Sequence, residues 1–154
     1  MTYTSLVEAW GTWLTMLGEW EWFVTLTMRE NSPEQVRAGW TRPGMATAKK
    51  MWRRFSEDLS LFSDSIDWVR VIEIQKWRGI PHIHALVGKA DQSIVEARDG
   101  AWKRFGFNKI VQYVPAKGAE HYICKYIVKE LQDIEFSPSL YEKERMRRKN
   151  AIFR

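Results

Sequence analysis

Two histidines, His82 and His84, stand one residue apart within the apolar stretch 79–87. Alternate side chains of a β-strand point to the same face, so a strand here would present both imidazoles together and send Ile83 into the opposite layer. A pair of imidazoles on one face suits a divalent metal ion. These are two of only three histidines in the chain. We therefore predict a metal site on this strand.

An oxygen ligand is available on the segment that precedes the histidines. Residues 68–75 alternate β-branched and longer polar side chains, which predicts a strand, and Gly79 and Pro81 fit the turn of a hairpin. Glu73 and Gln75 share one face of that strand, and either could lie beside the histidine pair. Two imidazoles and one carboxylate would leave coordination positions open, as a catalytic site requires.

The third chemically distinctive segment is 121–131. At about 3.6 residues per turn, its apolar residues form a stripe on one side, which predicts a helix packed on the core. The other side carries phenols and ammonium groups, from Tyr122, Lys125, Tyr126 and Lys129. Phenolic oxygens displayed in this way are candidate nucleophiles, and the ammonium groups could stabilise a phenolate or bind phosphate. Alternatively, the tyrosines pack under a neighbouring strand and the lysines are solubilising.

Together these segments resemble the HUH endonucleases, specifically the rolling-circle replication initiator (Rep) proteins of plasmids, small DNA viruses and phages. Three motifs of that family are similar to segments of this chain in the same order, namely the Thr-containing strand 22–28, the acid and histidine pair of 73–84, and the tyrosine helix 122–129. Each motif is weak alone, but the ordered set is specific. The resemblance implies an α+β fold, with an antiparallel sheet of four to five strands in the RRM-like, split βαβ arrangement.

The resemblance also implies the ligands of the metal. His82, His84 and an acid upstream of them would hold Mn²⁺ or Mg²⁺, and Glu73 is the residue that matches the acid of the motif. The spacing from Glu73 to His82 is one residue longer than in the commonest form, with Trp77 as the extra turn residue. The third ligand is therefore predicted to be Glu73, with Gln75 as the alternative.

The tyrosine helix is similar to that of the gene A-type initiators, in which both hydroxyls act in successive transfers. Tyr122 is favoured as the principal nucleophile and Tyr126 is close behind. Lys125 and Lys129 would assist electrostatically. Related single-tyrosine transposases usually carry a glutamine four positions after the tyrosine, where this chain has Tyr126, so a transposase is the second reading within the family.

The activity that the resemblance implies is nicking and joining of single-stranded DNA at a replication origin through a 5′-phosphotyrosine. A stem-loop would be the origin structure, and a host helicase would be a partner. Two readings from other classes compete with this one. A non-catalytic module could bind single-stranded nucleic acid through aromatic and basic side chains. A Zn²⁺ hydrolase could use His82 and His84, although no third histidine is well placed.

The formal net charge is +5, and the basic residues concentrate in two places. No acidic residue lies between positions 35 and 56, and the second concentration, at 141–154, has six basic residues against two glutamates. Either cluster could be an ordinary solvated surface. With a nuclease-like centre between them, nucleic acid is the expected partner. The residues predicted to bind DNA are Arg42, Lys49, Lys50, Arg53 and Arg54.

The length and composition suit one compact domain. A chain of 154 residues with 45% hydrophobic residues can fill a core. We expect an endonuclease domain over 1–136 and a basic tail over 137–154 that is either a terminal helix or disordered. No apolar run could cross a bilayer and no signal sequence opens the chain, so we expect no membrane contact and a cytoplasmic location. Cys124, the single cysteine, is expected to be a buried thiol.

The other elements follow from apolar periodicity. An opening helix should end near Gly18, and a strand should follow over 20–28. A long helix that covers the sheet has an apolar face of Trp52, Phe55, Leu59 and Phe62.

After the hairpin of 68–88, a helix over 92–105 and a strand over 108–114 precede the tyrosine helix. The predicted order is helix, strand, helix, strand, strand, helix, strand, helix. It suits an antiparallel sheet with helices on one side.

Overall fold

The computed structural model describes residues 2–61, 65–88, 90, 94, 106–114, 118, 122–125 and 133–152. Its elements are α1 (Tyr3–Leu17), β1 (Trp22–Met28), α2 (Pro33–Arg37), α3 (Met45–Leu59), β2 (Trp68–Ile74), β3 (Pro81–Val87), β4 (Gly106–Gln112), β5 (Ile134–Phe136) and α7 (Pro138–Ile152). The predicted helix over 92–105 falls almost entirely outside the described residues. Of the tyrosine helix, only 122–125 are described, and these four are helical.

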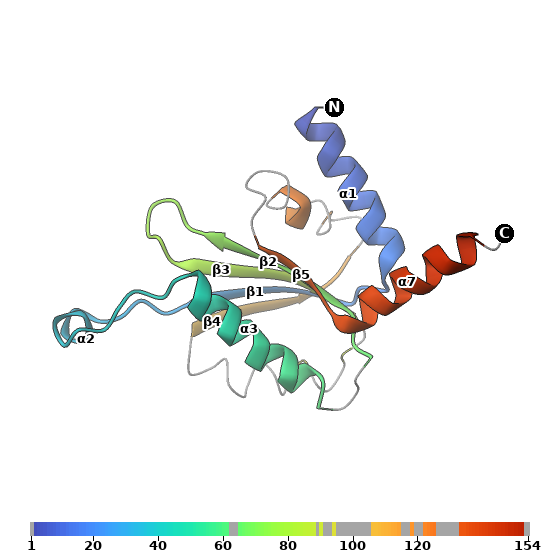
Figure 1. Cartoon of the computed structure of the whole chain (residues 1–154). Coiled ribbons are helices and arrows are strands. Elements are labelled where there is room, and N and C mark those ends of the chain that lie inside the picture. Colours follow the sequence, from blue (N-terminus) through green and yellow to red (C-terminus); the bar gives the residue numbers. More distant parts are fainter. Residues whose placement is uncertain are drawn as a thin grey trace.

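The five strands form one antiparallel sheet in the order β4-β1-β3-β2-β5 (Figure 1). β3 lies at the centre, between β1 and β2, and pairs with both over most of its length. The predicted fold class, an α+β fold with an antiparallel sheet of four to five strands, is therefore confirmed. The edge strand β5 was not predicted, because three residues are too few to establish an alternating pattern.

Helix α3 covers one face of the sheet. Trp52, Phe55 and Leu59 are buried there, as the sequence predicts, and they pack with Ile83 and Ala85 of β3 in the larger of two apolar clusters. Burying Phe55 and Leu59 contributes roughly 1.5–3 kcal/mol each. The two β3 residues alternate with His82 and His84, so this packing fixes the face on which the histidines project. The fourth residue of the predicted apolar face, at position 62, lies outside the described residues.

The other face is covered only in part. Helix α1 packs its Leu14 against a second apolar cluster that includes Leu86 of β3 and Val71 of β2. Ile123 and Cys124 add to the same cluster, so the prediction of a buried thiol is confirmed. The expectation that helices cover one side of the sheet is wrong, because α1 and α3 lie on opposite faces (Figure 1).

Two segments differ from a plain reading of the sequence. Helix α2 stands in an arm formed by residues 29–44, where only turns were predicted. A capping box between Ser32 and Gln35 starts the helix, and Figure 1 shows the arm extending away from the sheet. Residues 138–152 form helix α7, whose Leu140 is buried in the second apolar cluster. The division of the chain at residue 136 stays a prediction.

Candidate active site

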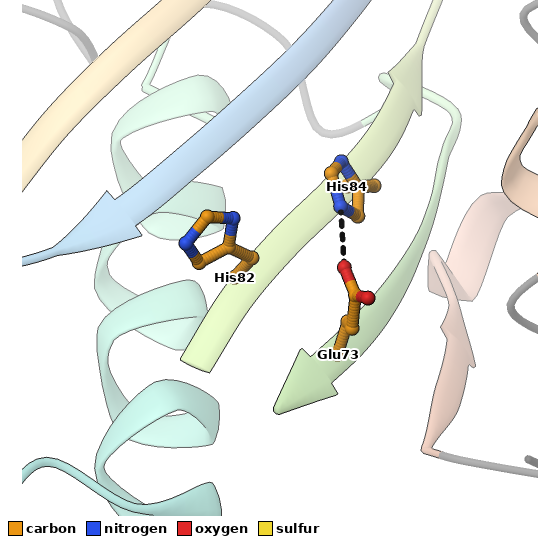
Figure 2. A group of neighbouring side chains, drawn as sticks. All are labelled: Glu73, His82 and His84. Carbon is orange, nitrogen blue, oxygen red and sulfur yellow. Dashed lines mark hydrogen bonds and ion pairs between the residues drawn. The ribbon is translucent and has the colours of Figure 1, made fainter. Parts of the chain in front are cut away.

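Strands β2 and β3 bring the predicted metal ligands to one place. In the antiparallel register Glu73 of β2 lies opposite His82 of β3, and Val71 lies opposite His84. Residues directly opposite each other in antiparallel strands place their side chains on the same face. The two histidines therefore share the sheet face that α3 does not cover, with Glu73 beside them (Figure 2).

The ligand atoms are close enough for one ion. A carboxylate oxygen of Glu73 and one ring nitrogen from each of His82 and His84 all lie within 4.8 Å of one another. Oε2 of Glu73 lies 3.3 Å from Nε2 of His84 (Figure 2). Gln75, the alternative third ligand, lines the same cleft. Two imidazoles and a carboxylate form a donor set that Mn²⁺, Mg²⁺ and other divalent ions accept.

The histidines are held in the form that binds metal. Burial lowers the pKa of His84 to about 4, and the positive charge of a protonated His82 would lower it further in the same direction. Burial also lowers the pKa of His82, with a contribution from the Arg78 guanidinium. Both rings are therefore neutral at pH 7, and a neutral imidazole is the species that ligates a cation.

One nitrogen of the pair points to a missing ligand. Nε2 of His82 is buried and has no hydrogen-bond partner among the residues that the structure describes. Leaving such a group unpaired costs about 1–3 kcal/mol. A bound cation would satisfy this nitrogen, so the residues present fit a metal ion.

Thr25 of β1 orients the second histidine. It lies opposite His84 in the register of β1 and β3, and its Oγ1 is 3.4 Å from Nδ1 of the ring. A hydroxyl can donate to or accept from Nδ1, so it accommodates either tautomer. If Nε2 of His84 bound a metal, Nδ1 would carry the proton and donate it to Thr25.

Tyr122 comes from a distant part of the sequence to the same cleft. Its ring lies edge-on to His84, with the centroids 5.5 Å apart, and edge-on to Phe23 at 5.7 Å. Ile123 and Cys124 are buried, whereas Tyr122 and Lys125 are exposed, as the helical pattern predicts. The predicted convergence of Tyr122 with the histidine pair is thus present. Tyr126 and Lys129 lie outside the described residues.

A cleft of about 800 Å³ joins these groups. Its walls include six residues that the sequence did not single out for the site: Phe23, Thr25, Lys76, Arg78, Lys109 and Val111. Lys109 of β4 lies opposite Thr25 in register and contributes a cation to the wall. Alternation along β4 would have placed Lys109 and Val111 on one face, but only the strand order shows which face.

The basic helix lies elsewhere. Four of the five residues predicted to bind DNA are on α3, which packs on the opposite face of the sheet from the histidines (Figure 1). All four are exposed, but Nζ of Lys49 is 2.5 Å from a carboxylate oxygen of Asp133. Arg42 lies in the arm, where its Nη1 donates to the carbonyl oxygen of Arg78 at 3.4 Å. The DNA-binding role of these residues stays a prediction.

An α+β fold with an open cleft over a histidine and carboxylate cluster defines a class of protein that can act on an anionic substrate. Comparison with protein families narrows this class. Residues 21–131 match the family model of the ORF2-type replication-associated proteins, so the chain belongs to this family. The same span contains the three motifs and the cleft. No curated protein and no solved structure matches the chain. None of the described helices is long and apolar enough to cross a membrane.

Proposed function

We propose that this replication-associated protein is a rolling-circle initiator of the HUH class, which nicks and joins single-stranded DNA at an origin. The observation that carries the proposal is the approach of the Tyr122 ring to the His84 ring, at 5.5 Å, in a cleft that also holds Glu73 and His82. These groups come from three elements of the chain. A tyrosine nucleophile beside a divalent cation is the arrangement that strand transfer needs.

His82, His84 and Glu73 would hold Mn²⁺ or Mg²⁺. When bound, the ion would act as a Lewis acid that offsets charge on a non-bridging phosphate oxygen. The neutral imidazoles donate lone pairs from fixed positions on β3, and Glu73 offsets part of the added charge. Thr25 keeps the His84 ring oriented through Nδ1.

In the transfer step, the hydroxyl oxygen of Tyr122 would form a bond to phosphorus and the bond from phosphorus to the 3′-oxygen would break. The phenolic proton would end on that 3′-oxygen, which leaves as a free hydroxyl. Lys109, in the cleft wall, and Lys125, on the same helix as the tyrosine, would attract the phosphate. The product is a phosphotyrosyl diester at the 5′ end. Since a diester replaces a diester, the step is nearly reversible and the 3′-hydroxyl can reattack to join the strand.

The test is incubation of the full chain with a labelled stem-loop oligonucleotide and Mn²⁺, a denaturing gel, and peptide mapping of the adduct. We expect a covalent adduct on the peptide that contains Tyr122, and its loss in Tyr122→Phe. Tyr141→Phe is the matched control, because Tyr141 is exposed on α7 and does not line the cleft. An adduct on Tyr126 would correct the nucleophile and keep the class. Binding without any adduct would overturn the proposed chemistry in favour of a binding module.

A further inference from the structure

The tip of the β2–β3 hairpin, Lys76-Trp77-Arg78, is a feature that the chemistry above does not use. Trp77 is 95% exposed, the highest value among the exposed large hydrophobic residues of the described part of the chain. Tryptophan at a free surface usually packs its ring at least partly, since its apolar area is large. The same residue also lines the cleft with His82 and Tyr122, although it lies at the turn. An indole at the mouth of an anion-binding cleft points to a ligand with flat aromatic groups.

The tip is held in a defined conformation. The amide of Gly79 donates to the carbonyl of Gln75 at 2.7 Å, and the amide of Gln75 donates to the carbonyl of Ile80 at 3.0 Å. Gly79 has φ +66°, a conformation that other residues rarely adopt, so the glycine permits the turn. Arg42 of the arm donates to the carbonyl of Arg78 from outside. Trp77 is therefore presented on a braced turn.

The charges around Trp77 are positive. Lys76 and Arg78 flank it, and Lys109 lines the same cleft. In the part of the chain that the structure describes, none of these three cations is within ion-pair distance of a carboxylate. The acid that lines the cleft, Glu73, lies beside His84 and belongs to the metal site. Cations without a partner carboxylate next to an exposed ring match a phosphate backbone with bases.

The cleft continues past the histidines. A smaller groove of about 290 Å³ shares Gln75, Arg78 and His82 with the cleft and leads to Phe107 on β4. Arg29 of the arm stands over the Phe107 ring, 5.2 Å from its centroid. Arg78 and His82 therefore lie between two connected hollows. A single strand could pass from Trp77 across Arg78 and His82 toward Phe107.

We propose that the Lys76-Trp77-Arg78 tip is a clamp for single-stranded DNA, in which Trp77 stacks on a base next to the reacting phosphate and Arg78 binds a phosphate. This inference rests on the proposed function for its substrate. It assigns the position of the strand to the hairpin tip on the cleft side, whereas the charge pattern of the sequence favours helix α3.

The test uses the full chain carrying Tyr122→Phe, without metal, so that binding is measured apart from chemistry. The probe is fluorescein-labelled dT20, followed by anisotropy. Trp77→Ala should raise Kd roughly 5- to 100-fold, the loss of one stacked base, and Trp77→Phe should restore most of the affinity. Arg78→Gln should lower the slope of log Kd against log salt by about one phosphate contact. Tyr141→Ala, an exposed aromatic among the arginines of α7, should leave Kd within about two-fold.

Photo-cross-linking locates the base directly. The dT20 probe with one 5-iododeoxyuridine should cross-link to the peptide that contains Trp77. Unchanged affinity of Trp77→Ala, or cross-links confined to α3 or α7, would overturn the clamp. These outcomes do not depend on the covalent adduct. Loss of the adduct with an intact Trp77 effect would refute the chemistry and leave the clamp, and the opposite pattern would refute the clamp alone.

Discussion

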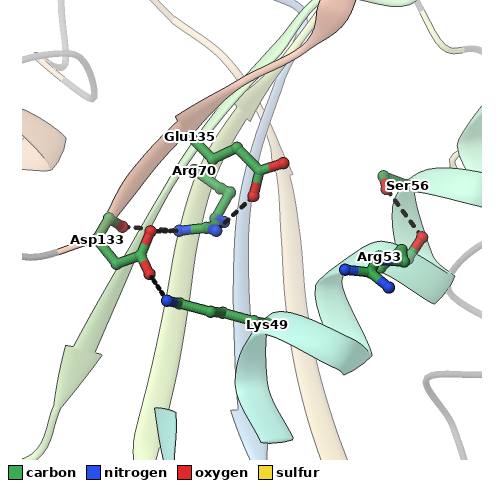
Figure 3. Close-up of polar contacts among 6 residues, drawn as sticks. All are labelled: Lys49, Arg53, Ser56, Arg70, Asp133 and Glu135. Atoms are coloured by element: carbon green, nitrogen blue, oxygen red, sulfur yellow. Dashed lines mark hydrogen bonds and ion pairs between the residues drawn. The ribbon is translucent and has the colours of Figure 1, made fainter. Parts of the chain in front are cut away.

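Strand β2 carries two polar clusters, one on each face of the sheet, and they differ in how completely their charges are paired. On the α3 face, Arg70 is 2% exposed, and its terminal nitrogens lie 2.9 Å from Asp133 and 2.5 Å from Glu135 (Figure 3). Lys49 of α3 binds the other oxygen of Asp133. The charges of this cluster are matched by opposite charges that the chain itself supplies.

On the other face, Glu73 and His84 make a contact of 3.3 Å, and Nε2 of His82 has no partner within the described residues. Both histidines are neutral, so neither offers Glu73 the full positive charge that Arg70 offers Asp133. The paired cluster ties β5 and α3 to β2 and is structural. The incomplete cluster opens into a cleft, and a site that is left incomplete in this way is suited to an external cation.

The largest expected effect comes from removing the incomplete cluster. The double variant His82→Ala/His84→Ala should lower the rate of Mn²⁺-supported adduct formation about a thousand-fold, since a bound cation contributes several kcal/mol to phosphoryl transfer. The measurement is single-turnover adduct formation on a denaturing gel. Mn²⁺ should raise the melting temperature of the wild type and have no such effect on the variant. A variant that reacts at the wild-type rate would show that the histidines do not hold the catalytic ion.

Breaking the paired cluster should instead lower stability. Arg70→Met leaves Asp133 and Glu135 without their buried partner and should cost about 2–4 kcal/mol of unfolding free energy, less than for a fully buried pair because both acids reach solvent. Urea denaturation measures the change. The folded variant should bind Mn²⁺ with wild-type affinity. Arg53→Met, on the exposed side of α3, is the control and should stay within about 0.5 kcal/mol.

The two clusters should also respond to acid in different windows. Folded His84 stays neutral down to a pKa of about 4, whereas in the unfolded chain it takes up a proton near pH 6.5. Metal-free stability should therefore fall as pH drops from about 6.5 to 4, by up to about 3 kcal/mol from this residue. His84→Gln should flatten this part of the curve, measured by urea denaturation with EDTA at each pH. A slope that persists in His84→Gln would assign it to another group.

Asp133 should act at lower pH. Burial alone would raise the pKa of Asp133, but the hydrogen bonds from Lys49 and Arg70 outweigh burial and hold it below the ordinary value of 3.8. The stability that this carboxylate contributes is present above pH 3.8 and should be lost as the pH falls through its folded-state pKa. Asp133→Asn should remove this acid step and leave the step between about pH 6.5 and 4 unchanged.

The smallest effect should come from the residue that orients His84. Thr25→Val keeps the shape of the side chain but cannot accept a hydrogen bond from Nδ1, and should weaken Mn²⁺ binding about ten-fold. Thr25→Ser should restore the affinity. Titration calorimetry measures both variants. A Val variant with wild-type affinity would mean that the 3.4 Å contact does not orient the ring.

Local patterns predicted the parts of the site that depend on one element at a time. Alternation on β3 is sufficient to place His82 and His84 together, and the helical period separates Tyr122 from Cys124. The capping residues Ser32 and Gln35 were also a readable signal for α2, which the sequence analysis treated as a turn.

What the sequence did not supply depends on how elements meet. The basic residues of α3 form a clear pattern, but whether they lie over the site depends on which face of the sheet the helix covers. Thr25 and Lys109 enter the site only through the order β4-β1-β3, which brings them into one row with His84. The clustering of Asp133 and Glu135 around Arg70 likewise depends on β5, a strand of three residues.

The central claim is that Glu73, His82 and His84 together hold a divalent cation beside Tyr122. The most direct measurement is an anomalous difference map from a crystal of the full chain soaked in Mn²⁺. The account predicts one strong peak within coordination distance of all three side chains, in the cleft that Tyr122 lines. A map with no peak there at saturating Mn²⁺, or with the ion bound only at other carboxylates, would contradict it.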